Sequence, residues 1–219
     1  MKILTTIIFV ALAHLLAAQP NETENNRFSL KINPLPLLDI YGGISWRIGT
    51  EFKLKNNIAA SLEYGKYFNY GTKGLKLNTK GDIIRVEVKY YRNDDKLCLG
   101  GFFSLEYLYK NTSFDYIDSI KIASTPTYEK RYTIYKEISC LTFKVGELNV
   151  YKNHFLVEWY MGVGLRFYTC GHNTLTDEEN DGVLRGEGHG DLSGDAMRVN
   201  AFKIFPNLSA GVKLGFKFK

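Results

Sequence analysis

The sequence predicts an all-β protein, an eight-stranded antiparallel up-and-down transmembrane β-barrel that follows a cleaved N-terminal signal peptide. Three observations predict this fold class. Apolar and polar residues alternate through eight segments, short and long connections follow one another in turn, and the one apolar run of helical character lies at the N-terminus. A chain of 219 residues with 45% hydrophobic residues is long enough for one such domain.

The first segment has the layout of a secretory signal peptide. Lys2 supplies the positive charge, residues 3–16 are almost wholly apolar, and Ala17-Ala18-Gln19 offers a cleavage site. The apolar core is too short to span a membrane comfortably. We therefore expect a signal peptide over 1–19, a polar leader over 20–26 and the barrel over 27–219.

Eight segments of the remaining chain read as strands. In the second, Trp46, Ile48 and Phe52 share one face, and Arg47 and Glu51 share the other, which is the period of two expected of a strand. The alternation breaks near residues 135–138, which predicts a β-bulge in the sixth strand. The expected strands are 27–40, 43–55, 58–68, 81–92, 96–110, 128–148, 154–168 and 199–218.

The connections indicate how these strands are arranged. Tight turns at 55–57, 93–95 and 149–153 alternate with long loops at about 69–80, 111–127 and 169–198. In an up-and-down meander alternate connections lie at the same end, so all three long loops are expected at one end of the barrel. Short turns at one end and long loops at the other are typical of outer-membrane barrels.

Aromatic residues gather near the expected strand ends, where the girdles of a membrane barrel lie. These residues are Phe28, Tyr67, Phe68, Tyr91, Tyr107, Tyr109, Tyr151, Phe155, Phe167 and Tyr168. A secreted, lipocalin-like soluble barrel is the alternative, because the same alternation with its faces inverted would line a ligand cavity with apolar side chains.

The polar faces carry charges of both signs among Gly and Ser residues, and we expect them to fill the barrel interior as an ion-pair network. Eight strands enclose a space just wide enough for side chains, so the sequence predicts no open pore. The expected network comprises Arg47, Glu51, Glu63, Arg85, Glu87, Lys89, Glu106, Glu158, Arg166 and Lys213.

The signal peptide, the stretch from Leu30 to Leu35 that leads into residues 42–49, and the Phe216-Lys217-Phe218 end together resemble a known group. The chain is similar to small outer-membrane β-barrel proteins of the OmpA/OmpX-like clan, and most similar to an uncharacterised family of Gram-negative secreted barrels. The resemblance covers essentially the whole mature chain. It implies an outer-membrane location and insertion by the outer-membrane assembly machinery, and it transfers no catalytic residue.

The loop over 169–198 is the most distinctive segment, with seven acidic residues against two arginines. The carboxylate oxygens and the two flanking imidazoles of this loop could bind a metal ion. The acidic residues lack the spacing of an EF-hand, however, which favours the alternative interpretation of a solvated acidic loop. The candidate ligands are Asp177, Glu179, Asp181, His172 and His189. We expect no cofactor and no catalytic residue. A lipid-modifying enzyme of the outer membrane stays the alternative, with His172 and His189 as its only histidines at the long-loop end.

Charge and cysteine content define the remaining expectations. A net charge of +5 that is scattered along the chain argues against a nucleic-acid partner. Outer-membrane lipid and lipopolysaccharide are the expected partners, met in part by the basic loop 69–80, and loop 169–198 is a candidate site for an extracellular partner. Three cysteines form no disulfide framework. One disulfide is left open, between Cys98 and Cys140, because these residues are expected on neighbouring strands.

Overall fold

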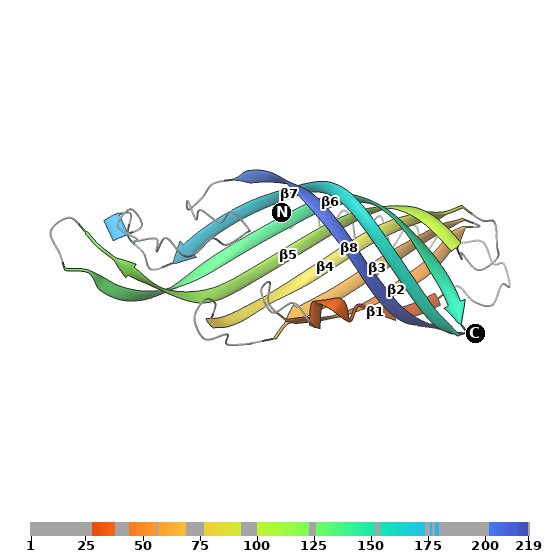
Figure 1. Cartoon of the computed structure of the whole chain (residues 1–219), viewed down its shortest axis with the longest axis horizontal. Helices are drawn as coiled ribbons and strands as arrows, with labels where there is room; N and C mark the ends of the chain where they lie inside the picture. Colours follow the sequence, from red (N-terminus) through yellow and green to blue (C-terminus); the bar gives the residue numbers. More distant parts are fainter. Residues whose placement is uncertain are drawn as a thin grey trace.

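The computed structural model describes residues 28–37, 44–55, 57–68, 77–92, 100–122, 126–151, 154–173, 176, 178–179 and 202–218. Eight antiparallel strands close into a barrel in simple chain order (Figure 1), which confirms the predicted all-β, eight-stranded barrel. The strands are β1 (Phe28–Ile32), β2 (Ser45–Lys55), β3 (Ile58–Tyr67), β4 (Leu77–Tyr91), β5 (Gly100–Ile120), β6 (Tyr128–Tyr151), β7 (Phe155–Asn173) and β8 (Lys203–Lys217). The expected signal peptide and leader lie outside the described residues.

The strand register sets the tilt of the barrel. A path of paired residues that starts at Lys31 crosses all eight strands and reaches Phe205, whereas Lys31 itself pairs with Gly215. This stagger of ten residues requires strands that are tilted by about 35–45° to the barrel axis. Residues far apart in the sequence thus reach the same level inside the barrel.

The strands are longer than expected at the long-loop end. β5 and β6 stay paired as far as Ile120 and Tyr128, so most of the loop expected at 111–127 is a two-stranded ribbon that projects beyond the other strands (Figure 1). β7 also continues to Asn173, and β4 begins at Leu77. The loop boundaries were wrong because paired backbone groups satisfy one another along a hairpin, even where the sequence is polar.

The first strand is shorter than expected, since β1 ends at Ile32 and not near residue 40. Pro34 and Pro36 follow, and neither can donate a backbone hydrogen bond to a sheet ladder. The chain instead makes a single turn of 3₁₀ helix, η1 (Leu35–Leu37).

The bulge expected near residues 135–138 is also wrong, because β6 pairs with β5 and with β7 without a register shift. The even-numbered residues of β6 face inward throughout, from Lys144 and Thr142 to Ile134 and Tyr132. What changes along the strand is the chemistry of the two faces. Inward residues are charged or polar in the middle of the barrel and mainly apolar toward the long-loop end, where Lys136 is an exception.

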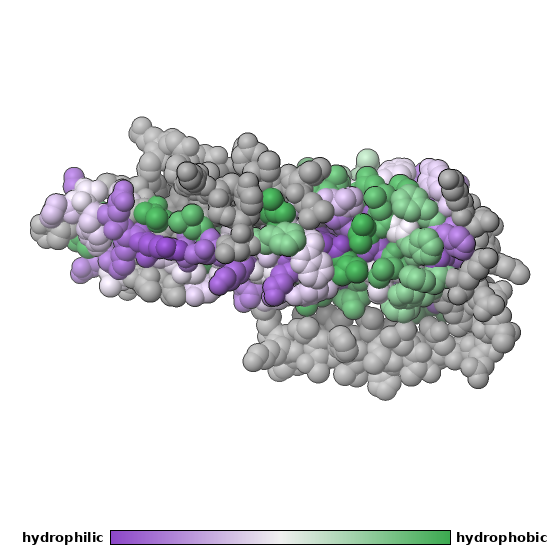
Figure 2. All heavy atoms as spheres, turned by 90° about the horizontal axis from the view of Figure 1, so that it is seen from below, coloured by the Kyte–Doolittle hydropathy of each residue, from purple (hydrophilic) through white to green (hydrophobic). Residues whose placement is uncertain are grey.

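The outer surface carries an apolar band over the tight-turn part of the barrel and polar residues toward the long-loop end (Figure 2). Outward side chains such as Leu105, Phe143 and Val163 are about half exposed. Three of the aromatic residues expected in the girdles face inward instead, because Tyr67, Tyr91 and Tyr168 are buried. No helix among the described residues is long and apolar enough to cross a membrane.

Candidate functional site

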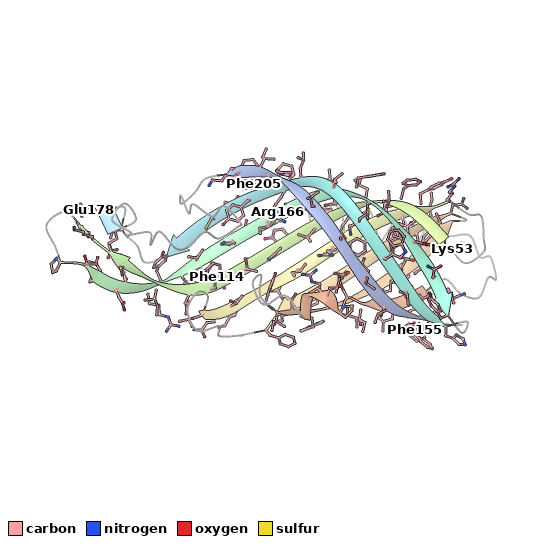
Figure 3. All side chains as sticks on the ribbon, viewed as in Figure 1. Lys53, Phe114, Phe155, Arg166, Glu178 and Phe205 are labelled. Carbon is pink, nitrogen blue, oxygen red and sulfur yellow. The ribbon has the colours of Figure 1, made fainter. Side chains whose placement is uncertain are left out.

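The interior of the barrel is the candidate site, and it is built from the polar face of each strand. Glycines on this face make room for large side chains from neighbouring strands. A Cβ on Gly211 would lie 2.5 Å from the Tyr160 hydroxyl, and a Cβ on Gly162 would lie 2.6 Å from Cγ of Lys144. The alternation of glycine with charged residues therefore allows a narrow barrel to hold long side chains (Figure 3).

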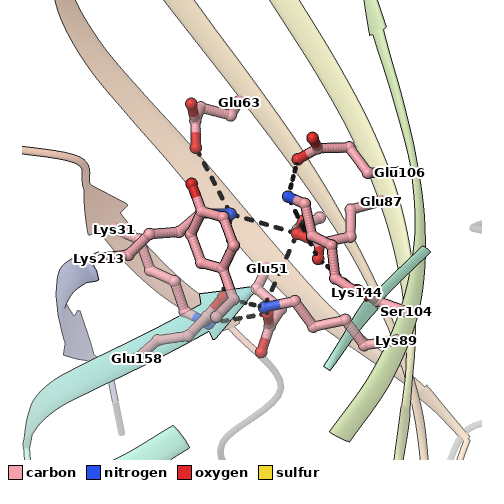
Figure 4. Close-up of polar contacts among 12 residues, drawn as sticks. Lys31, Glu51, Glu63, Glu87, Lys89, Ser104, Glu106, Lys144, Glu158 and Lys213 are labelled. Atoms are coloured by element: carbon pink, nitrogen blue, oxygen red, sulfur yellow. Dashed lines mark hydrogen bonds and ion pairs between the residues drawn. The ribbon is translucent and has the colours of Figure 1, made fainter. Parts of the chain in front are cut away.

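Glu158 on β7 lies at the centre of the first half of the network (Figure 4). Its carboxylate accepts hydrogen bonds from Lys31 Nζ at 2.5 Å and from Lys89 Nζ at 2.6 Å. Both lysines also pair with Glu51, at 2.8 and 2.7 Å. The Tyr91 hydroxyl donates a further hydrogen bond to Glu51 at 2.9 Å. Two carboxylates and two ammonium groups from four different strands thus neutralise one another.

Glu87 on β4 connects this group to the second half of the network. Lys213 Nζ lies 3.2 Å from Glu87, 3.5 Å from Glu63 and 3.9 Å from Glu158. The hydroxyls of Ser104 and Ser61 donate hydrogen bonds to the Glu87 carboxylate, at 2.7 and 3.3 Å.

Glu106 on β5 completes the network. It accepts a hydrogen bond from Lys144 Nζ, and Arg85 lies between Glu106 and Glu63, at 3.9 and 3.6 Å. Lys144 also packs over the Tyr160 ring, with 4.2 Å between Nζ and the ring centroid. The five carboxylates Glu51, Glu63, Glu87, Glu106 and Glu158 face five cations, Lys31, Arg85, Lys89, Lys144 and Lys213, so the network is formally neutral. Such mutual pairing is what makes buried charge tolerable.

Eight of the ten residues expected in the interior belong to this network. The other two, Arg47 and Arg166, also face inward. Arg47 donates a hydrogen bond to the Ser45 hydroxyl at 3.4 Å and interacts electrostatically with Glu63, and Arg166 donates to the Asn207 side-chain oxygen at 2.9 Å.

Lys31 and Lys144 are network members that the expected set lacked. The signal for Lys31 was available in the alternation of β1, where Ser29 and Lys31 oppose Phe28 and Leu30. Lys144 lies on the polar face of β6, and its partner Glu106 on β5 was already in the expected set.

Apolar layers lie on both sides of the ion pairs. At the tight-turn end the core residues are Ala59, Tyr91, Phe102, Leu148, Leu156 and Tyr160. At the long-loop end they are Phe114, Tyr132, Ile134, Tyr168 and Cys170. Lys136 lies within this second layer, with Nζ 5.2 Å from the centre of the Phe114 ring. Side chains therefore fill the described interior at three successive levels.

Glu179 from the third long loop binds the β5–β6 ribbon. Its carboxylate accepts hydrogen bonds from Lys130 Nζ at 2.7 and 2.8 Å, from the Tyr128 hydroxyl at 2.9 Å and from the Thr176 amide at 2.8 Å. The Thr176 hydroxyl in turn accepts from the Glu179 amide, which makes a reciprocal capping box. Hydrogen bonds from Lys130, above all, lower the pKa of Glu179 to about 2.

This arrangement bears on the candidate metal ligands. Glu179 is engaged by an ammonium group, which disfavours a cation beside it. The described residues contain no group of three His, Cys, Asp or Glu side chains that could hold a metal ion. Asp177, Asp181, His189 and the side chain of His172 lie outside the described part of the chain.

Asp115 on β5 anchors the base of the same ribbon. It accepts hydrogen bonds from Asn78 at 2.9 Å, Arg131 at 2.6 Å and Thr133 at 2.9 Å. These three bonds lower the pKa of Asp115 to about 2. Asn78 itself adopts a left-handed backbone with φ of 54°, at the register shift where β4 joins β5.

Cys140 and His154 both lie on the barrel itself, away from the third long loop. Cys140 is a buried free thiol on the inner face of β6, and Cys98, the disulfide partner that the sequence left open, lies outside the described residues. His154 stacks on Phe216 at the tight-turn end, with 5.5 Å between ring centroids. It therefore lies at the opposite end of the barrel from the long loops.

No protein-family model matches this chain, and no curated protein matches it. Among solved structures, the chain is similar to the N-terminal β-barrel domain of Pseudomonas aeruginosa OprF. The two share 10% sequence identity over 89% of this chain and 98% of that chain, with a TM-score of 0.40. An identity this low transfers no residue role to this chain.

Proposed function

We propose that this protein is a small, non-enzymatic barrel of the outer membrane of a Gram-negative bacterium, with a structural or surface-interaction role and no open pore. The observation that carries the proposal is the orientation of the two faces. Charged side chains fill the interior, and outward side chains such as Leu105, Phe143 and Val163 are apolar and exposed. In water that orientation would expose a large continuous apolar surface, whereas in a bilayer it is favourable.

The same orientation argues against a lipocalin-like carrier, because a carrier needs an apolar interior with room for its ligand. Here Lys89, Lys144 and Glu158 in the middle of the interior are completely buried among partners. A filled, ion-paired interior likewise supports a barrel that conducts little or nothing.

The surface role is assigned to the long-loop end. The β5–β6 ribbon projects there, and Glu179 ties the loop that includes residues 169–198 to it. We propose that this loop and the ribbon form the platform for an extracellular partner, that the basic loop 69–80 contacts lipopolysaccharide, and that the Phe216-Lys217-Phe218 end serves the assembly machinery. The alternative function is that of a lipid-modifying enzyme that uses the loop histidines His172 and His189.

Heat-modifiable gel mobility of the outer-membrane fraction tests the proposal. A closed barrel that resists SDS should migrate differently before and after boiling, and it should remain in the membrane pellet after a carbonate wash. Protein that appears in the soluble periplasmic fraction with one gel mobility would overturn the proposal. For the surface role, replacement of 174–198, the part of this segment that follows β7, by a Gly/Ser linker should preserve the gel shift and abolish binding to cells or matrix.

A further inference from the structure

The outward face of β5 and β6 differs from that of β7 and β8 at the tight-turn end. On β7, every outward residue from Phe155 to Phe167 is apolar or aromatic. On β8 the same holds from Ile204 to Phe216. On β6, by contrast, the outward face turns polar at Glu147, well before the strand ends at Tyr151.

The apolar outward face is shorter on β6 than on β7. On β6 the polar residues Ser139 and Glu147 bracket it, eight residues apart. At about 3.3 Å per residue and a tilt of about 40–45°, they are separated by about 19–20 Å along the barrel axis. The twelve residues from Phe155 to Phe167 on β7 rise about 28–30 Å on the same basis. A membrane barrel normally presents a band about 25 Å tall.

Two tyrosines mark the end of this short face that lies toward the long loops. The Tyr107 hydroxyl lies 3.3 Å from the Ser139 hydroxyl, and Tyr109 hydrogen-bonds the Glu137 carboxylate. Tyrosine with its ring in an apolar band and its hydroxyl on a polar group is typical of the membrane–water interface.

Glu147, a partly exposed carboxylate, marks the tight-turn side of this face. Glu147 has no ion-pair or hydrogen-bond partner among the described residues, and its partner in the register is Gly101. A Cβ on Gly101 would meet only the Gly146 carbonyl oxygen, at 4.0 Å, so no described side chain covers the backbone at this position.

We propose that the β5–β6 face, defined by outward residues 101–109 of β5 and 139–149 of β6, locally thins the bilayer, so that phospholipid headgroups and water reach Glu147. This inference rests on the proposed outer-membrane location. The occupant is lipid because the face is continuous with the apolar band on β7. A second copy is disfavoured, since two-fold packing would set the carboxylates near one another and the outward residues of this face include no cation.

Refolding into vesicles of defined thickness tests the proposal. Wild type and Glu147→Leu are refolded into phosphatidylcholine bilayers with acyl chains of 12, 14, 16 and 18 carbons, and the folded fraction is read from the gel shift. Leu at 147 should extend the apolar face and raise the ratio of folded protein in 16-carbon to 12-carbon bilayers at least fivefold. Glu147→Gln should give a smaller rise in the same direction.

Glu129→Leu is the matched control, because Glu129 is an exposed carboxylate on β6 in the ribbon, far from the band. It should leave the thickness profile unchanged. Equal profiles for wild type and Glu147→Leu would overturn the proposal, and so would a Leu variant that folds in no bilayer while wild type folds. A wild-type protein that inserts into no vesicle and stays soluble would instead refute the proposed location itself.

Discussion

Removal of the Glu158 charge provides the sharpest test of the buried network. In Glu158→Gln the side chain keeps its shape and loses its charge. Lys31 and Lys89 now bind separate carboxylate oxygens, at 2.5 and 2.6 Å, so one lysine would keep a neutral acceptor oxygen and the other would face an NH2 group. Both lysines would then depend on Glu51 as their nearest carboxylate. The five-to-five balance becomes an excess of one positive charge in a site that is closed to solvent.

The expected loss of unfolding free energy follows from the burial of Glu158. Glu158 and Lys89 are completely buried, and breaking a buried ion pair by removing one partner costs about 3–5 kcal/mol. The residual pairing with Glu51 places the expected loss of unfolding free energy at the lower end, about 3 kcal/mol. That corresponds to roughly a hundredfold change in the unfolding equilibrium.

Urea titration of the barrel in vesicles, followed by the gel shift and by tryptophan fluorescence, measures this loss. The exposed Glu129→Gln on the neighbouring strand is the control and should stay within about 0.5 kcal/mol of wild type. Lys89→Met in the Glu158→Gln background should recover part of the loss, because it removes the unbalanced cation. If Glu158→Gln is as stable as the control, the interior is hydrated and the network does not hold the barrel together.

Two further predictions concern backbone packing and the loop contact. Gly164→Ala should destabilise the barrel by about 1–3 kcal/mol in the same titration, because its Cβ would lie 2.0 Å from the Leu141 carbonyl oxygen. Gly101→Ala, with 4.0 Å of space, should be nearly neutral, and equal effects would contradict this packing. For Glu179, the folded pKa of about 2 lies below the usual value of about 4.3. The contact with Lys130 should therefore be fully stabilising above pH 4.3 and be lost as the pH falls toward 2. Carboxyl ¹³C shifts and exchange of the Glu179 amide should report that window, and release near pH 5 would refute it.

The fold itself was largely predictable from the sequence. A period of two in segments such as 43–55 shows which residues share a face, and connections that alternate in length place the long loops at one end. The mixed charges among small residues indicated which face turns inward. Errors arose where pairing overrides local composition, as in the ribbon over Thr112–Ile120, and where proline shortened β1.

By itself, then, the sequence determined the strand number, the two faces of each strand and the presence of charge in the interior. Only the tertiary structure decided which charges meet, because the ten-residue stagger brings Lys31 of β1 to Glu158 of β7, 127 positions away. The same stagger decides where the outward face of β6 becomes polar relative to that of β7. Periodicity is a property of one strand, whereas ion pairs and the height of the apolar band depend on the register between strands, which is fixed only when the barrel closes.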